Sequence, residues 1–291
     1  MIMNSWINIK QIEKKIDDFK LGPINLTIEP GTITALVGHN GSGKSTILKM
    51  IMNLVKPDSG DITVFTDSVT GEDESWKQYI AYQAQTAIGY AIFTGQTLKD
   101  LFSNWYPTWN EERFYHIVEL FQIPLDKRFG KMSQGAQQKL RLALTIATNA
   151  RILILDEPTS FIDIPSKNKL IDLLVEWMDE DERAIIMASH QTEDIHKLAD
   201  YIAIFHQGQL LGKYEKEELT ANYYQYWIQE ELPPTSIPGE VARKGNQVIS
   251  NQADLTEQHL RDLQITWTDR RGLHLEEVIT ILLTEAGKGP R

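Results

Sequence analysis

A glycine-rich segment between a short apolar run and an amphipathic stretch constrains the fold more than any other feature of the chain. Residues 38–46, GHNGSGKST, match the pattern G-x-x-x-x-G-K-[ST]. Residues 33–37 before them form a nearly continuous apolar run, which is typical of a strand buried on both faces of a parallel sheet. Glycines let the backbone curl so that successive N–H groups point at phosphate oxygens, and the N-terminus of the next helix adds its positive dipole end. An ordinary glycine turn is the alternative, which the strand–helix context disfavours.

The loop therefore predicts nucleotide binding, and its last residues have distinct expected roles. Lys44 is expected to reach the β- and γ-phosphates, and Ser45 to give its hydroxyl to Mg²⁺. The expected nucleotide contacts in the loop are Gly38, His39, Asn40, Gly41, Ser42, Gly43, Lys44, Ser45 and Thr46.

Two adjacent carboxylates follow a second apolar run, residues 152–155. Asp156 and Glu157 then stand at the carboxyl end of a predicted strand, where open α/β sheets bind their ligands. Asp156 is suited to hold the shell of Mg²⁺, directly or through water, and Glu157 to polarise a water for attack on the γ-phosphate. Alone, the pair could be a helix-start signal. Paired with the phosphate loop, it indicates a P-loop nucleoside triphosphatase.

The order of elements predicts an α/β fold with an antiparallel β part near the N-terminus. The expected strands are residues 24–28, 33–37, 61–65, 152–155 and 184–188. The expected helices lie near residues 44–55, 110–121 and 167–178 and after Ser133. From about residue 97 to 147 the apolar period is helical. A helical insertion between two parts of an α/β sheet is the simplest organisation.

A change of composition after residue 212 predicts a second unit. Residues 231–240, ELPPTSIPGE, carry three prolines and are typical of a linker, and residues 246–282 give weak strand and helix signals. We expect an ATPase domain over residues 1–219 with a helical subdomain at about 95–147. A linker and a small C-terminal α/β domain are expected over residues 220–291.

Charge and composition exclude several classes of protein. The chain has 29 Lys and Arg against 40 Asp and Glu, a net charge of −11, which argues against coating nucleic acid. It has no cysteine, so disulfides, a thiolate nucleophile and cysteine-ligated metals are excluded. No apolar stretch approaches the ~20 residues that cross a bilayer, and the first residues lack the apolar block of a signal peptide. We expect any work at a membrane to be done from the cytoplasmic side through a partner.

Further segments, taken in order, resemble the motifs of an ABC-type ATPase domain. They are Gln85, MSQGA at residues 132–136, LILDEPTS at 153–160, SFID at 160–163 and ASH at 188–190. The resemblance covers about residues 5–215. The whole chain is similar to the ATP-binding subunits of bacterial ABC exporters of the Ytr and bacitracin-export kind, which are encoded separately from their membrane subunits.

This resemblance implies roles for residues outside the phosphate loop. Glu157 would be the catalytic base, His190 would hydrogen-bond the γ-phosphate and hold Glu157, and Gln85 would contact Mg²⁺ or water. The implied catalytic set is thus Glu157, His190 and Gln85, and the implied metal set is Ser45, Gln85 and Asp156.

The signature segment is implied to act on a second chain. Ser133 and Gly135 would meet the γ-phosphate held by the opposite subunit, although Ser133 alone could be only a helix N-cap. The sequence departs from the usual LSGGQ at Gln134 and Ala136, and Asp163 would communicate between the two sites.

The adenine-stacking residue is the weakest match. The family stacks adenine on an aromatic residue upstream of the loop, and that position falls near Lys15 or Ile16, neither of them aromatic. Phe19 is the nearest aromatic candidate, with a core role as the alternative.

Two aromatic groups could contact partners. One lies in the stretch next to Gln85, where the family receives a helix of the membrane subunit, and comprises Tyr90, Phe93, Phe102, Trp105, Tyr106 and Trp109. The other, residues 223–227, could serve dimerisation or belong to a core.

The resemblance implies an ATPase subunit that couples the binding and hydrolysis of Mg²⁺-ATP to substrate movement, with export as the expected direction. Its implied partners are membrane-spanning subunits and a second copy or a related ATPase subunit, at the cytoplasmic face of the cell membrane. A soluble ABC protein acting on nucleic acid or in assembly is the alternative, disfavoured by the acidic charge. A module that binds ATP without turnover is disfavoured by Glu157 and His190.

Overall fold

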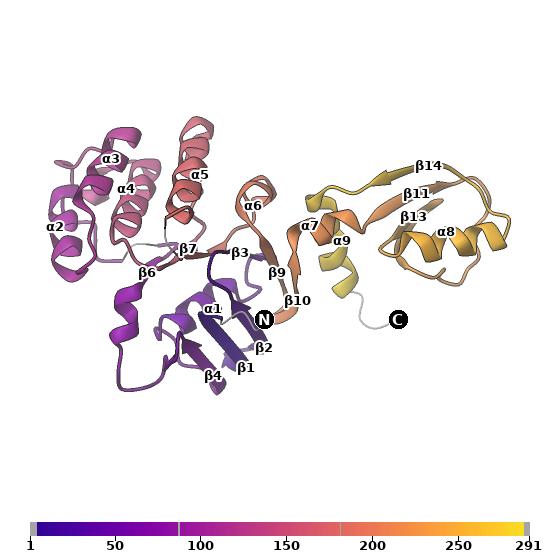
Figure 1. Ribbon diagram of the computed structural model, residues 1–291, viewed down its shortest axis with the longest axis horizontal. Helices are drawn as coiled ribbons and strands as arrows, with labels where there is room; N and C mark the ends of the chain where they lie inside the picture. The colour runs from indigo at the N-terminus through magenta and orange to yellow at the C-terminus, as the bar shows by residue number, and fades with distance from the viewer. Residues whose placement is uncertain (1–4, 87, 181, 288–291) are drawn as a thin grey trace.

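The computed structural model describes residues 5–86, 88–180 and 182–287. Figure 1 shows a larger lobe, which contains β1 to β10, and a smaller lobe, which contains β11 to β14 and α8, with α7 and α9 between them. The expected α/β P-loop architecture is confirmed in the larger lobe.

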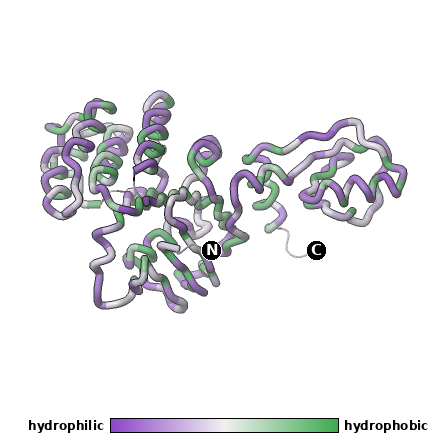
Figure 2. The backbone as a smooth tube through the Cα atoms, viewed as in Figure 1, coloured by the Kyte–Doolittle hydropathy of each residue, from purple (hydrophilic) through white to green (hydrophobic). Residues whose placement is uncertain are grey.

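A six-stranded sheet forms the centre of the larger lobe. Its strands, in spatial order, are β10 (Gln209–Glu215), β9 (Tyr201–His206), β3 (Ile33–Val37), β8 (Ala184–Ala188), β7 (Ile152–Asp156) and β6 (Ile80–Gln83). Neighbouring strands are parallel, except that β10 runs antiparallel to β9. Every residue of β3, β7 and β8 is buried, as their apolar runs predict for strands covered on both faces. Figure 2 shows these strands as a hydrophobic centre.

An antiparallel sheet covers one face of the central sheet. It consists of β2 (Phe19–Ile28), β1 (Ile7–Ile16), β4 (Ser59–Val64) and β5 (Asp67–Ser68), in that order. The helix α1 (Lys44–Ile51) packs between the two sheets, and its Ile47 and Leu48 share one core with Leu36 and Ile154 of the central strands. The antiparallel part expected near the N-terminus is thereby confirmed.

Helices lie on the other side of the central sheet. They are α2 (Gly95–Trp105), α3 (Glu111–Phe121), α4 (Gln134–Ala147), α5 (Ile164–Met178) and α6 (Thr192–Leu198). Among them, α2 and α3 pack on α4 rather than directly on the strands. The residues of the strands alternate between the two cores, so that Leu153 and Leu155 face these helices while Ile152 and Ile154 face α1. Two short 3₁₀ segments, Ser75–Tyr79 and Phe129–Lys131, connect these layers.

Two helix boundaries differ from the expected ones. α1 ends at Ile51 rather than near Val55, because Asn53 has a left-handed backbone with a φ of 55°. α5 starts at Ile164, three residues before the expected Lys167, because the Asp163 side chain accepts from the Ser166 N–H and Pro165 suits a first turn.

The smaller lobe has its own sheet and core. The elements after β10 are α7 (Lys216–Ala221), β11 (Tyr224–Ile228), β12 (Glu240–Lys244), β13 (Gln247–Ser250), α8 (Ala253–Asp262), β14 (Trp267–Gly272) and α9 (Leu275–Ala286). The strand order is β12-β13-β11-β14. Tyr223 and Tyr226 are buried, which favours a core role over a partner surface for both.

The last helix packs back on the larger lobe. Leu275, Val278, Ile279 and Leu283 of α9 belong to the core that the central sheet shares with α2 to α6. The last helix therefore contacts the larger lobe as well as following β14 of the smaller one. Within the described residues, no helix has the length and apolar character that spanning a membrane requires.

Candidate nucleotide-binding site

The phosphate loop connects β3 to α1, and close contacts restrict two of its glycines. A Cβ on Gly38 would lie 2.1 Å from the carbonyl oxygen of Phe205. A Cβ on Gly43, whose φ is +107°, would lie 2.3 Å from a methyl carbon of Leu21. A side chain at Gly38 would therefore displace the backbone of β9, whereas one at Gly43 would push the Leu21 side chain of β2 aside and strain the backbone at its positive φ.

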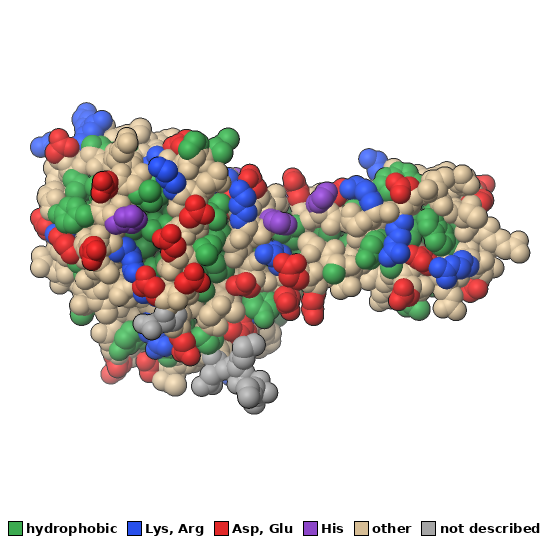
Figure 3. Space-filling model, turned by 45° about the horizontal axis from the view of Figure 1, so that its top comes forward, with side chains coloured by type: hydrophobic (Ala, Val, Ile, Leu, Met, Phe, Trp, Pro, Cys, Tyr) green, Lys and Arg blue, Asp and Glu red, His purple; other side chains and the backbone are tan. Residues whose placement is uncertain are grey.

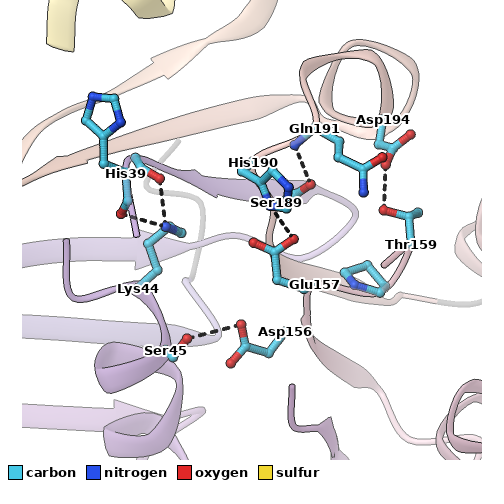
Figure 4. Close-up of polar contacts among 12 residues, drawn as sticks. His39, Lys44, Ser45, Asp156, Glu157, Thr159, Ser189, His190, Gln191 and Asp194 are labelled. Atoms are coloured by element: carbon cyan, nitrogen blue, oxygen red, sulfur yellow. Dashed lines mark hydrogen bonds and ion pairs between the residues drawn. The ribbon is translucent and has the colours of Figure 1, made fainter. Parts of the chain in front are cut away.

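Lys44 folds its ammonium back across this loop. Its Nζ donates to the carbonyl oxygens of Gly38 at 2.7 Å and of His39 at 3.2 Å (Figure 4). Burial lowers the pKa of Lys44, and the nearby carboxylates of Glu157 and Asp156 partly oppose that shift. The loop thus holds a desolvated cation beside its own backbone, in position to meet anionic oxygens.

Ser45 and Asp156 meet across the site. The Ser45 hydroxyl donates to Asp156 Oδ1 at 3.2 Å, joining the first turn of α1 to the end of β7. Burial raises the pKa of Asp156, and the adjacent Glu157 adds to this, while the Ser45 hydrogen bond and Lys44 oppose it. A hydroxyl and a carboxylate side by side form the kind of oxygen donor set that suits a hard cation such as Mg²⁺.

Glu157 has an unusual backbone conformation. Its φ is +54°, which is uncommon for a residue with a side chain, and its N–H donates to the Ala188 carbonyl at 2.9 Å. His190, just beyond β8, brings Nδ1 to 2.8 Å from Glu157 Oε2. Figure 4 shows the imidazole standing over the carboxylate. The two predicted catalytic residues therefore lie in direct contact.

An open cleft of about 630 Å³ lies over these groups. Residues 40–46 of the phosphate loop, Asp156, Glu157 and the exposed Gln85 line it. Phe19 and Ile16, at the turn between β1 and β2, form its apolar end. The structure thus brings Gln85 and Phe19 to the site with the loop and the acidic pair, and Ile16, one of the two positions with which the family's stacking residue aligns, lies there too.

Ser133 and Gly135 lie apart from this cleft. Ser133 is the N-cap of α4 and accepts from the Ala136 N–H at 3.3 Å. A Cβ on Gly135 would lie 2.8 Å from the carbonyl oxygen of Phe161, so the signature segment packs on the turn before α5. Neither Ser133 nor Gly135 is among the described residues that line the cleft.

Two residues of α4 that bear on the site, the buried Gln138 and the half-buried Arg141, were not predicted from the sequence. The side-chain amide of Gln138 donates to the carbonyl oxygens of Glu157 and Pro158, and Arg141 donates to those of Ala84 and Gln85. Residue type alone does not reveal burial, so neither could be told from a solvated polar residue of an amphipathic helix.

A strand, a phosphate loop and a helix, with paired carboxylates at the end of a neighbouring parallel strand, define a P-loop nucleoside triphosphatase. The family model described as ABC transporter matches residues 21–160. The chain is 31% identical over 218 residues to the ABC transporter ATP-binding protein YtrB of Bacillus subtilis (strain 168), covering 75% of this chain and 74% of that protein. The chain belongs to the ATP-binding proteins of ABC transporters, and it is an ATP-hydrolysing subunit of that kind.

Solved structures share the fold. The structure of an ATP binding subunit of an ABC transporter matches with a TM-score of 0.68 at 21% identity, over 75% of this chain and 92% of that one. The dimeric, post-hydrolysis structure of the ATP-binding cassette MJ0796 bound to ADP and Pi matches with a TM-score of 0.64 at 21% identity, over 72% and 98%. Proteins of this family work with membrane subunits and dimerise.

Proposed function

We propose that this chain binds Mg²⁺-ATP in the cleft over β3 and β7 and hydrolyses it with Glu157 as general base. The contact between Glu157 and His190, placed beside Lys44 and the Ser45–Asp156 pair, carries the proposal. A carboxylate at this strand end can accept the proton of an attacking water. His190 would hold that carboxylate and the γ-phosphate.

The other site residues would bind and orient the nucleotide. The loop N–H groups and Lys44 would hold the phosphates, and Phe19 with Ile16 would contact the adenine. Ser45, Asp156 and Gln85 would hold Mg²⁺, which when bound neutralises phosphate charge.

A second chain would complete the site. Ser133 and Gly135 lie outside their own cleft, so they can reach a γ-phosphate only on a partner, a second copy or a related subunit. Close to Asp163 in the sequence, Phe161 is 65% exposed and Ile164 76% exposed, and a partner would cover them.

A membrane subunit would dock beside the nucleotide site. A groove of about 230 Å³ is lined by Tyr90, Phe102, Leu144 and Arg141 together with Ile88, which is 89% exposed. Tyr90 packs edge-on against Phe102 and Phe129 and so forms the wall, whereas Trp105 on α2 is 82% exposed. We assign this surface to a helix of the membrane subunit at the cytoplasmic face, with export as the direction that the resemblance favours.

The first test is phosphate release from the purified chain and its Glu157→Gln variant. We expect the variant to bind ATP with unchanged affinity and to turn over about 100- to 10,000-fold more slowly, because it lacks the base. Glu193→Gln, an exposed carboxylate of α6 that pairs with Lys197, is the matched control and should behave as wild type. Wild-type turnover by Glu157→Gln would refute the assignment.

A further inference from the structure

Arg141 joins α4 to the segment that carries Gln85. Its Nη1 donates to the carbonyl oxygens of Ala84 at 2.7 Å and Gln85 at 2.9 Å. Its Nη2 donates to the side-chain oxygen of Gln138, one turn earlier on the same helix. The guanidinium is therefore shared between a backbone segment at the cleft and a neighbouring side chain.

Gln138 continues this connection to the catalytic carboxylate. Its side chain is 1% exposed, and its amide nitrogen donates to the carbonyl oxygens of Pro158 at 2.7 Å and Glu157 at 3.3 Å. Hydrogen bonds thus run without interruption from the Gln85 carbonyl, through Arg141 and Gln138, to the Glu157 carbonyl. We call this run the α4 relay.

At both ends of the α4 relay, a small shift of the backbone would change the nucleotide site. Gln85 lines the nucleotide cleft, and the Glu157 backbone has a φ of +54° that its surroundings must maintain. The strands β6 and β7 pair as far as Gln83 and Leu155, so both segments lie just past the paired ends of adjacent strands. The α4 relay links these two segments just beyond the last paired residues of β6 and β7.

The α4 relay also borders the docking groove. Arg141 lines that groove with Tyr90 and Phe102, and its Nε is buried without a hydrogen-bond partner among the described residues. Burial lowers the pKa of Arg141. Charge-assisted hydrogen bonds are about twice as strong as neutral ones, so the carbonyls held by this cation are held firmly.

We propose that Arg141 is a positioning residue, which acts through Gln138 to fix the Glu157 backbone relative to the segment of Gln85. The proposal rests on the proposed function of Glu157 as the base. An occupant of the groove that moves residues 84–85 would then move the carboxylate, so docking and hydrolysis would share one hydrogen-bonded path.

The test compares Arg141→Met and Gln138→Glu with a control, Arg113→Met. Arg113 donates to Asn149 at 2.6 Å and to Glu180, so its loss removes an arginine of similar packing that contacts neither end of the α4 relay. Gln138→Glu keeps an acceptor for Arg141 and removes the amide that donates to Glu157. Phosphate release, KM, nucleotide affinity and Tm would be measured for each, alongside Glu157→Gln.

We expect kcat to fall about 10- to 100-fold in both α4 relay variants, with KM and the nucleotide dissociation constant within about twofold of wild type. The double variant should be no slower than the slower single variant, because both changes break one path. Arg113→Met should lower Tm similarly and leave kcat unchanged.

Equal kcat values in Arg141→Met and Arg113→Met, or additive losses in the double variant, would overturn the proposal. Failure of the proposed function would look different: wild type would release no phosphate, or Glu157→Gln would match it.

Discussion

At the residue scale, Asp156 and Lys44 are opposite charges whose desolvation opposes folding of the empty site. Burial is the main cause of both pKa shifts, which lower the pKa of Lys44 and raise that of Asp156. The attraction between the two charges only partly offsets the cost of removing each from water. The site therefore sacrifices stability so that a cation and two carboxylates stand ready in one cleft, a common trade-off at functional sites.

Asp156→Asn should stabilise the chain at neutral pH while impairing its activity. Because the pKa of Asp156 is raised in the folded state, its ionised form destabilises the fold above the ordinary value of 3.8, and this penalty vanishes below it. Asparagine keeps an acceptor for Ser45 and carries no charge. We expect a higher Tm at pH 7, a gap that closes on acidification, and activity about 10- to 100-fold lower. Calorimetry without nucleotide over a pH series checks this, and a lower Tm at pH 7 would contradict it.

At the element scale, α4 connects the parts of the site. Its first residues form the signature segment, its apolar residues Leu140, Leu142 and Ile146 pack in the core, and Gln138 and Arg141 contact the two segments beside the cleft. One helix therefore lines the groove, donates hydrogen bonds beside Glu157 and carries the surface that a partner would contact.

The assignment of the aromatic surface next to Gln85 to a helix of the membrane subunit predicts a selective effect of Trp105→Glu. Because Trp105 is exposed on α2, a charge there should leave basal ATPase and Tm near wild type and remove the stimulation by the membrane subunits. Leu255→Glu, which changes an exposed apolar residue of α8, is the control. The measurement is phosphate release with and without the reconstituted membrane subunits, and retained stimulation in Trp105→Glu would refute the assignment.

The elements that could be predicted from the sequence are those specified locally. Buried parallel strands such as β3 and β7 are short apolar runs, and the loop at residues 38–46 is defined by its glycines and Lys44. The contact of Glu157 with His190 followed from the resemblance. The strands β11 and β12 and the return of α9 depend on tertiary packing, which periodicity does not encode. The α4 relay could not be predicted from the sequence for the same reason.

At the scale of the whole molecule, charges of both signs are mixed over the surface drawn, and the two lobes are connected at both ends of the smaller one. Acidic and basic side chains are interspersed over both lobes on the face drawn in Figure 3, so charge gives no single broad basic surface there. α9 packs on the core of the larger lobe and continues from β14 of the smaller one, so the smaller lobe is tied to the larger at both of its ends.

If a second chain completes each nucleotide site, Ser133→Arg should separate nucleotide binding from turnover. ATP affinity of the isolated, dilute chain and phosphate release at concentrations that allow pairing would be measured on the same variant. We expect the ATP affinity to be unchanged, because Ser133 lies outside its own cleft. We expect turnover to fall by at least about 100-fold, because a bulky cation at this position would block the γ-phosphate bound by the partner. Wild-type turnover in Ser133→Arg would contradict the account.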